Sequence, residues 1–176
     1  MPEPFTPPSI VVGVDGSRAA VRAALWAVDE AVSRDIPLRL VYSVEPPGSG
    51  RTDPDDEARR LSAADTAVRE AVTAVESTDR PVKVEMEIAK GRPTATLLEA
   101  SRHAAMICVG AIGIRHFEHN RVGSTASALV AGAHCPVAIV RGSDRAVPHG
   151  PGWVVVELDE SPDSAAVLAC GVEEAR

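Results

Sequence analysis

The chain has 176 residues, of which 45% are hydrophobic and 24% are charged, and its formal net charge is −7. This balance is typical of a globular domain and excludes a wholly disordered chain. An acidic chain with only 3% aromatic residues is also a poor candidate for binding nucleic acid or an anionic membrane surface.

The apolar pattern alternates between strand and helix signals. Short apolar runs indicate strands buried on both faces of a sheet, and apolar residues three or four positions apart indicate helices. In chain order the sequence predicts a strand at 9–15, a helix at 18–34, a strand at 38–44, a helix at 57–76, an alternating edge strand at 82–88, a helix at 93–103, a strand at 105–110, a helix at 124–133 and a strand at 136–141. Five strands separated by four helices predict a parallel, Rossmann-like three-layer α/β sandwich.

Proline-rich segments flank this pattern. Residues 1–8 are expected to be a loose tail, and residues 142–152, which hold two prolines, are expected to be a linker. The tail has neither the basic nor the apolar stretch of a signal peptide, and no apolar run approaches the roughly 18 residues of a membrane span. We therefore expect one domain at 9–141, a cytoplasmic location and no membrane segment.

The segment at 153–176 is similar to the start of that domain. At an offset of 144 residues, Val155–Ser161 matches Val11–Ser17, and alanine-rich sequence follows both. We expect the first strand, at 154–158, and the first helix of a truncated second unit, with chance similarity of two valine-rich runs as the alternative. Such a fragment cannot bury its apolar faces alone, so it should pack on the first unit, pack on another copy or stay disordered.

The three cysteines do not indicate a metal or a disulfide framework. Cys108, Cys135 and Cys170 are odd in number and widely spaced, without the spacing of a zinc site. We expect Cys108 in the core, Cys135 to be inert, and no metal ligands among the three.

Two segments at predicted strand ends carry the binding chemistry. In an open parallel sheet, ligands bind beyond the carboxyl ends of the strands, where the strand order reverses. Gly13–Ser17 follows the first strand, and the fourth strand leads into the pattern G-x2-G-x9-G-S-T, which begins at Gly110 and ends at Thr125. Its first two glycines leave room for a bulky ligand, and the helix start with two hydroxyls favours phosphate. The spacing is neither that of the P-loop nor that of the dinucleotide fingerprint.

These motifs resemble those of the universal stress protein family. The resemblance covers 9–141 and is carried by VVGVDGS near the start, by the motif G-x2-G-x9-G-[S/T], and by the closing HCPVAIVR. It implies a sheet of order 3-2-1-4-5, of the adenine nucleotide alpha-hydrolase-like type, and dimerisation through the fifth strand. It further implies the branch that binds ATP, alone or with Mg²⁺, and a family in which tandem-repeat members are common.

The resemblance also implies roles for individual residues. Those placed at the adenosine part are Gly13, Val14, Asp15, Ser43, Val109 and Gly110. Those placed at the phosphates are Gly113, Gly123, Ser124 and Thr125. Within the first set, Asp15 is also expected to face the ribose, and Ser43 to contact adenine through its backbone.

The sequence departs from the family pattern at one phosphate position. Close tandem-type relatives often carry an arginine ten residues after the first glycine of the motif, and here that residue is Asn120, followed by Arg121. Arg115, His116 and His119 could supply the positive charge instead. The alternative is that these side chains only solvate the loop.

Structural and functional alternatives stay open. Asp15 could simply cap the first turn, and Ser124 and Thr125 could be only N-caps. The main hypothesis is an ATP-binding regulatory or sensing module of the stress response, and the rivals are a nucleotide-free scaffold and a slow ATPase. No dedicated base or arginine finger stands out, so we assign no catalytic residue. The expected partners are an adenine nucleotide and a second copy, through the last strand or 153–176.

Overall fold

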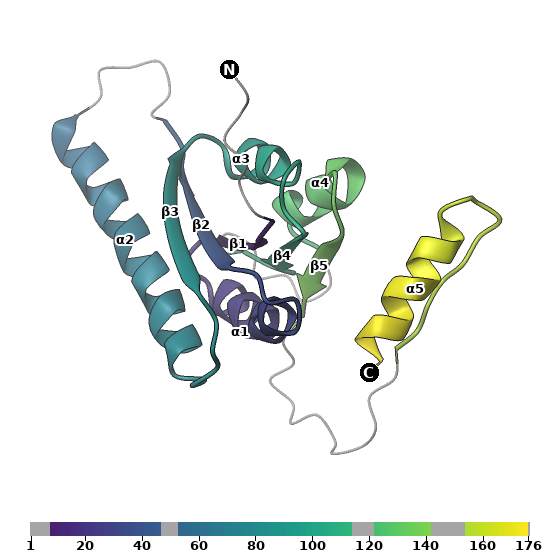
Figure 1. Ribbon diagram of the computed structural model, residues 1–176. Helices are drawn as coiled ribbons and strands as arrows, with labels where there is room; N and C mark the ends of the chain where they lie inside the picture. The colour runs from purple at the N-terminus through teal and green to yellow at the C-terminus, as the bar shows by residue number, and fades with distance from the viewer. Residues whose placement is uncertain (1–7, 47–52, 114–121, 142–153, 176) are drawn as a thin grey trace, which may run out of the picture. The chain divides into compact units, whose positions relative to one another are not determined.

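The computed structural model describes residues 8–46, 53–113, 122–141 and 154–175. The predicted tail, apart from Pro8, and the predicted linker therefore lie outside the described residues, as does the charged loop at 114–121. The chain divides into two units, Met1–Gly142 and Ser143–Arg176 (Figure 1). All strands of the described residues belong to the first unit.

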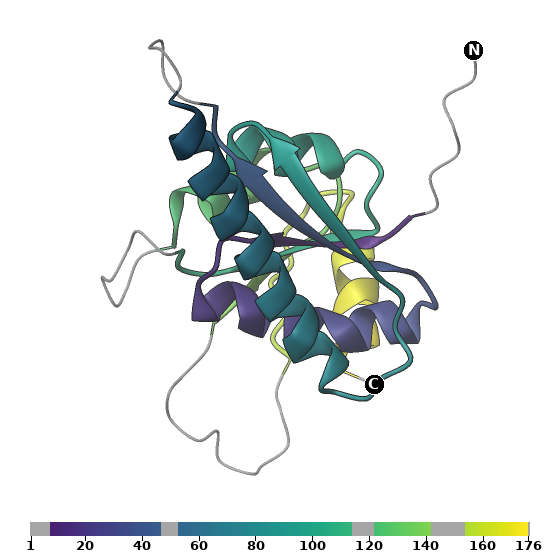
Figure 2. The same cartoon turned by 90° about the vertical axis from the view of Figure 1, so that its left-hand side faces the viewer.

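The first unit is a five-stranded parallel sheet with helices on both faces (Figures 1 and 2). Its strands are β1 (Ile10–Val14), β2 (Leu38–Val44), β3 (Val84–Lys90), β4 (Met106–Gly110) and β5 (Val137–Val140). Its helices are α1 (Arg18–Ser33), α2 (Pro54–Glu76), α3 (Pro93–Ala100) and α4 (Ser124–Gly132). The sheet order is β3-β2-β1-β4-β5 with parallel pairing throughout, which confirms the predicted fold class and strand order.

β1 lies at the centre of the sheet and is buried on both faces, which explains its unbroken apolar run. Ile10, Val12 and Val14 belong to the core that α1 and α2 form on one face, and Figure 2 shows α2 along that face. Val11 belongs to the core on the other face, together with Leu97 of α3 and residues of α4. Parallel pairing of β1 with both β2 and β4 brings the carboxyl ends of these three strands to one edge of the sheet.

Three elements differ from the prediction by more than one residue at an end: α2, α3, which ends at Ala100 and not at residue 103, and β3. α2 begins at Pro54 rather than at residue 57, because Asp53 caps it by accepting a hydrogen bond from the backbone N–H of Asp55 (3.1 Å) and Pro54 fits the first helical position. β3 covers Val84–Lys90, two residues later than predicted, because its register is set by β2, where Leu38 pairs with Val84. Its place at the edge of the sheet is confirmed.

The end of α3 is fixed to the chain that leads into β5. The hydroxyl of Ser101, which is 1% exposed, donates to the carbonyl of Leu98 (2.6 Å) and accepts from the backbone N–H of His134 (3.0 Å). Next to it, burial raises the pKa of the Cys135 thiol, in keeping with the inert cysteine expected there. These contacts hold α3 and α4 in place, and both helices begin at the candidate site.

The second unit contains α5 (Ser164–Glu174) but not the strand expected at 154–158. A strand needs hydrogen bonds from a neighbouring strand, and the described residues of this unit provide none. The turn before α5 nevertheless repeats the first unit: the Ser161 N–H donates to Asp159 Oδ1 at 2.9 Å, as the Ser17 N–H does to Asp15 Oδ1 at 2.9 Å. Hydrogen bonds from Ser161 and Ser164 hold the pKa of the Asp159 carboxyl below its ordinary value.

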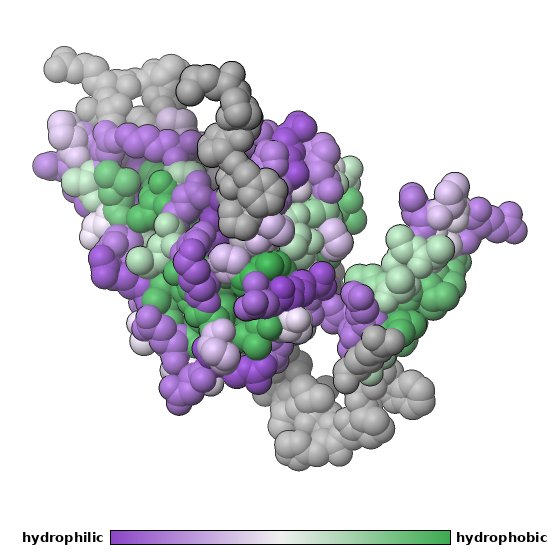
Figure 3. All heavy atoms as spheres, in the orientation of Figure 1, coloured by the Kyte–Doolittle hydropathy of each residue, from purple (hydrophilic) through white to green (hydrophobic). Residues whose placement is uncertain are grey.

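The apolar residues of the second unit are exposed, and Figure 3 shows hydrophobic side chains along it. Val155 is 90% exposed, whereas Val11, its counterpart at the offset of 144 residues, is fully buried. Val167 and Leu168 are likewise about half exposed, and their counterparts Ala23 and Ala24 are fully buried. Within this unit, therefore, positions that form core in the first unit are uncovered.

Candidate functional site

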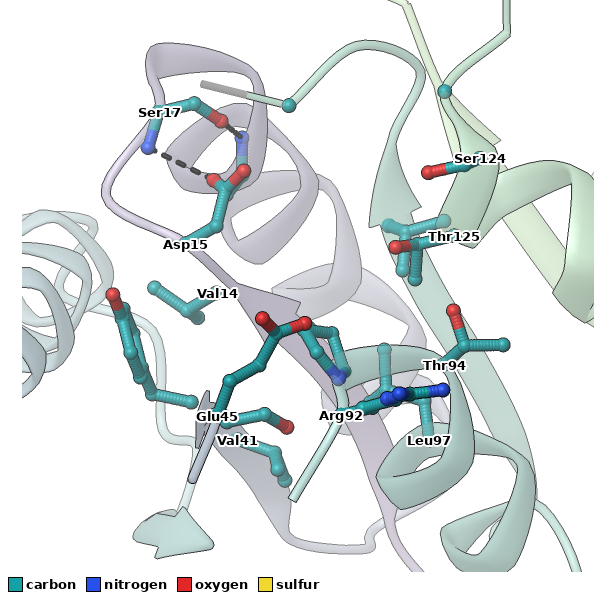
Figure 4. Close-up of a pocket in the computed structure, with 18 of the residues that line it drawn as sticks. Val14, Asp15, Ser17, Val41, Glu45, Arg92, Thr94, Leu97, Ser124 and Thr125 are labelled. Carbon is teal, nitrogen blue, oxygen red and sulfur yellow. Dashed lines mark hydrogen bonds between the residues drawn. The ribbon is translucent and has the colours of Figure 1, made fainter. Parts of the chain in front are cut away.

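A cavity of about 990 Å³ lies at the carboxyl ends of β1, β2 and β4, bordered by the starts of α3 and α4 (Figure 4). It lies where connections leave the sheet on opposite sides, as expected for a doubly wound fold. The structure brings to this one cavity the predicted residues Gly13, Val14, Asp15, Ser43, Val109, Gly110, Gly113, Gly123, Ser124 and Thr125. The remaining candidates lie outside the described residues; they are Arg115, His116, His119, Asn120 and Arg121.

The floor of the cavity is apolar. Val41 of β2, Leu97 of α3 and Val109 of β4 line it and are at most 5% exposed. Gly13 lies directly beneath two of them: a Cβ at this position would meet Leu97 Cδ1 at 2.8 Å and Val109 Cγ1 at 3.2 Å. The strand ends therefore present a smooth aliphatic surface, which suits the face of a flat ring.

Asp15 connects the loop after β1 with the loop after β4. Its Oδ1 accepts from the backbone N–H of Ser17 (2.9 Å), and Ser17 Oγ caps α1 by accepting from the Ala20 N–H (3.1 Å). This is the structural role that we considered for Asp15. Its other oxygen lies so close to Gly113 that a Cβ there would be 2.6 Å from Asp15 Oδ2. The carboxylate thus stabilises the turn and also lines the cavity.

The start of α4 is suited to an anion. The N-cap is Gly123, which has no side chain to cap the helix, so Ser124 and Thr125 are the first helical residues and are not N-caps. The Gly123 N–H donates to the carbonyl of Ala111 (2.8 Å), and Ser124 and Thr125 line the cavity. The N–H groups of a first helical turn without a side-chain cap and two hydroxyls therefore border the space where a negative group would be stabilised.

The three glycines of the motif differ in how much space a side chain would have. We expected Gly110 to leave room for a ligand, but a Cβ there would lie 2.7 Å from the backbone carbon of Ala19, so the close approach of α1 is what requires it. At Gly113 the close neighbour is the carboxylate of Asp15. At Gly123 the nearest atom to an added Cβ is Ala111 O at 3.5 Å, so this position has space.

Charged and hydroxyl side chains that the sequence reasoning missed also line the cavity. They are Tyr42, Glu45, Arg60, Arg92 and Thr94. Glu45, Arg92 and Thr94 come shortly after strands or at a helix start, so the strand-end rule applied to β2 and β3 would have found them. Arg60 lies on α2 and had no such signal; its guanidinium pairs with Asp56 (3.2 Å) and donates to the carbonyl of Glu45 (3.5 Å).

Within the four described ranges, no cluster of three or more His, Cys, Asp or Glu residues is placed to hold a metal ion. Within the same ranges, no helix is long and apolar enough to cross a membrane.

A parallel sheet of this order, with a strand-end cavity next to an uncapped helix start, defines a doubly wound α/β protein of the kind that binds nucleotides. The sequence model of the universal stress protein family matches residues 8–141, and the chain belongs to that family. Universal stress protein Rv2028c of Mycobacterium tuberculosis (strain H37Rv) is 56% identical over 176 residues, all of this chain. The chain spans 63% of the length of that relative.

Solved structures of the family have the same fold. The universal stress protein UspA from Lactobacillus plantarum is 28% identical, with a TM-score of 0.59 over 78% of this chain and 100% of that one. The universal stress protein from Archaeoglobus fulgidus in complex with dAMP is 26% identical, with a TM-score of 0.58 over 77% of this chain and 98% of that one.

Proposed function

We propose that the first unit binds ATP in the strand-end cavity and works as a regulatory or sensing module in the stress response. The observation that carries the proposal is the start of α4, where first-turn N–H groups without a side-chain cap and two hydroxyls border the cavity. The cavity volume of about 990 Å³ suits a nucleotide. The dAMP complex of the Archaeoglobus fulgidus family member supports an adenine nucleotide as the ligand class.

The proposed arrangement follows the chemistry of the cavity wall. The base would lie on the aliphatic floor at Gly13, Val41 and Leu97, next to the backbone of Ser43. The ribose hydroxyls would donate to Asp15, and the phosphates would accept from the start of α4. Mg²⁺, where present, would enter with the phosphates.

Equilibrium binding to the whole chain tests the proposal. Calorimetric titration with ATP, ADP, AMP and adenosine should show one saturable site, with affinity rising with the number of phosphates because more of them can reach α4. Mass spectrometry of small molecules released on denaturation gives an independent check. Failure of all four ligands to bind at millimolar concentration would instead favour the scaffold function, and steady phosphate release from ATP would favour the ATPase.

Gly113→Ala should lower the affinity for nucleotide while the chain keeps its fold. The added Cβ would lie 2.6 Å from Asp15 Oδ2, so the carboxylate must move away from its place in the cavity wall. Losing one hydrogen bond to a charged group costs about 1.5–3 kcal/mol, which is a roughly 10- to 100-fold loss of affinity for ATP and for adenosine. Calorimetry on this variant and on Gly132→Ala, whose Cβ would meet only Leu98 Cδ2 at 3.4 Å, checks it; equal binding by both contradicts it.

We also propose that residues 154–175 are the start of a second unit of the same kind. The repeated Asp-x-Ser turn and the exposed apolar counterparts of buried residues support this origin. Self-association through the open edge of β5, or through this unit, and a cytoplasmic location belong to the same proposal.

A further inference from the structure

The two ends of the cavity carry different polar groups: hydroxyls and a helix start at one end, and charged side chains at the other. Figure 4 shows Ser124 and Thr125 at one end, and Val41, Glu45 and Arg92 away from them at the other. The first end carries the features suited to phosphate. The second end is therefore where the base of the proposed nucleotide would lie, and it holds a guanidinium that the phosphate hypothesis does not use.

Arg92 is a cation at this second end that has no partner among the described residues. It is the N-cap of α3, with extended backbone (φ −75°, ψ 135°), and its side chain makes no hydrogen bond that caps the helix. Among the described residues its guanidinium has no ion pair and no hydrogen bond, although it lines the cavity. Arg60, the other arginine among the described lining residues, is instead held by Asp56 and by the carbonyl of Glu45.

At this second end the floor of the cavity, on which the base would lie, is made of aliphatic side chains. Val41 and Leu97 are 2% and 4% exposed and line the cavity beside the strand ends. Such side chains contact one face of a planar ring and leave its other face open. A guanidinium is planar, weakly hydrated for a cation, and stacks on aromatic faces, which an ammonium group does less well.

We infer that Arg92 stacks on the base of the bound nucleotide and covers the ring face opposite the floor of Val41 and Leu97. This inference rests on the proposed nucleotide binding and adds a residue that sets affinity for the base rather than for the phosphates. A stacked guanidinium contributes equally to adenosine and to ATP, whereas a phosphate contact contributes only to ATP.

Titration of variants of the whole chain with adenosine and with ATP distinguishes stacking on the base from contact with the phosphates. Arg92→Ala should lose about 3- to 30-fold in affinity for adenosine and the same factor for ATP. Arg92→Lys should remain weaker than the unmodified chain for both ligands, because the charge is kept and the planar group is lost. Arg102→Ala, the same change of charge at an exposed residue beyond the far end of α3, should bind both ligands as the unmodified chain does.

Each other outcome overturns the inference in a recognisable way. A loss confined to ATP assigns Arg92 to the phosphates, full recovery in Arg92→Lys assigns its effect to charge alone, and unchanged adenosine affinity in Arg92→Ala removes it from the site. If the unmodified chain binds neither ligand, the proposed function itself has failed. Circular dichroism and thermal unfolding of each variant establish that the fold is kept.

Discussion

Gly123→Glu should abolish ATP binding while leaving the fold intact. The position has room, because an added Cβ would find its nearest neighbours at 3.5–4.0 Å, and its backbone (φ −61°, ψ 156°) suits any residue. A carboxylate at the N-cap also agrees with the helix dipole, so the helix itself is not weakened. The same carboxylate occupies the anion site and repels the phosphates, at about 4 kcal/mol for two unit charges 4 Å apart near a protein surface. We expect at least a roughly 100-fold loss of affinity for ATP.

The matched control is Gly123→Gln, which has the same shape without the charge. Calorimetry should show that Gly123→Gln keeps most of the ATP affinity, and that Gly123→Glu still binds adenosine, because only the phosphate end is changed. Thermal unfolding should give similar midpoints for both variants. Equal ATP affinity in Gly123→Glu and Gly123→Gln would mean that the start of α4 does not hold the phosphates.

The fold could be predicted because its signals are local. β1 reads as a buried parallel strand since its four apolar side chains each face one of two cores. Ser17 reads as a helix cap because its hydroxyl accepts a hydrogen bond from the N–H three residues ahead. The strand at 154–158 could not be predicted correctly in the same way. Its valines have the composition of a strand, but a strand forms only where a neighbour supplies hydrogen bonds, and that depends on contacts that local sequence does not encode.

The location of the candidate site, at the ends of particular strands, could be predicted from the sequence. The roles of its individual residues could be predicted less well. The rule that ligands bind beyond the carboxyl ends of parallel strands brought Gly13–Ser17 and the motif from Gly110 to Thr125 to one cavity. It did not say whether the space beside each glycine is taken by the ligand or by a neighbouring part of the chain. Gly110 belongs to the motif and lines the cavity, yet its missing side chain faces Ala19 of α1. That distinction depends on how α1 packs against β4.

Gly110→Ala should therefore destabilise the fold, and more strongly than Gly13→Ala. At Gly110 the added Cβ would lie 2.7 Å from Ala19 C and 2.9 Å from Ala19 O, which are backbone atoms at the start of α1. These atoms move only if the helix moves, and Ser17 and Asp15 hold that helix start by hydrogen bonds. Overpacking of this kind costs about 1–3 kcal/mol in the free energy of unfolding.

Gly13→Ala is the matched comparison, since its added Cβ also has a neighbour closer than 3.0 Å. That neighbour is Leu97 Cδ1, the end of a flexible side chain next to a cavity, so it can rotate away. The lower conformational entropy of the unfolded chain with alanine offsets part of the remaining cost, by about 0.4–1 kcal/mol. Urea unfolding without nucleotide should rank the stabilities as unmodified chain, Gly13→Ala, then Gly110→Ala. The reverse order for the two variants would show that α1 yields more easily than Leu97, and that the glycine of the motif is kept for the ligand and not for packing.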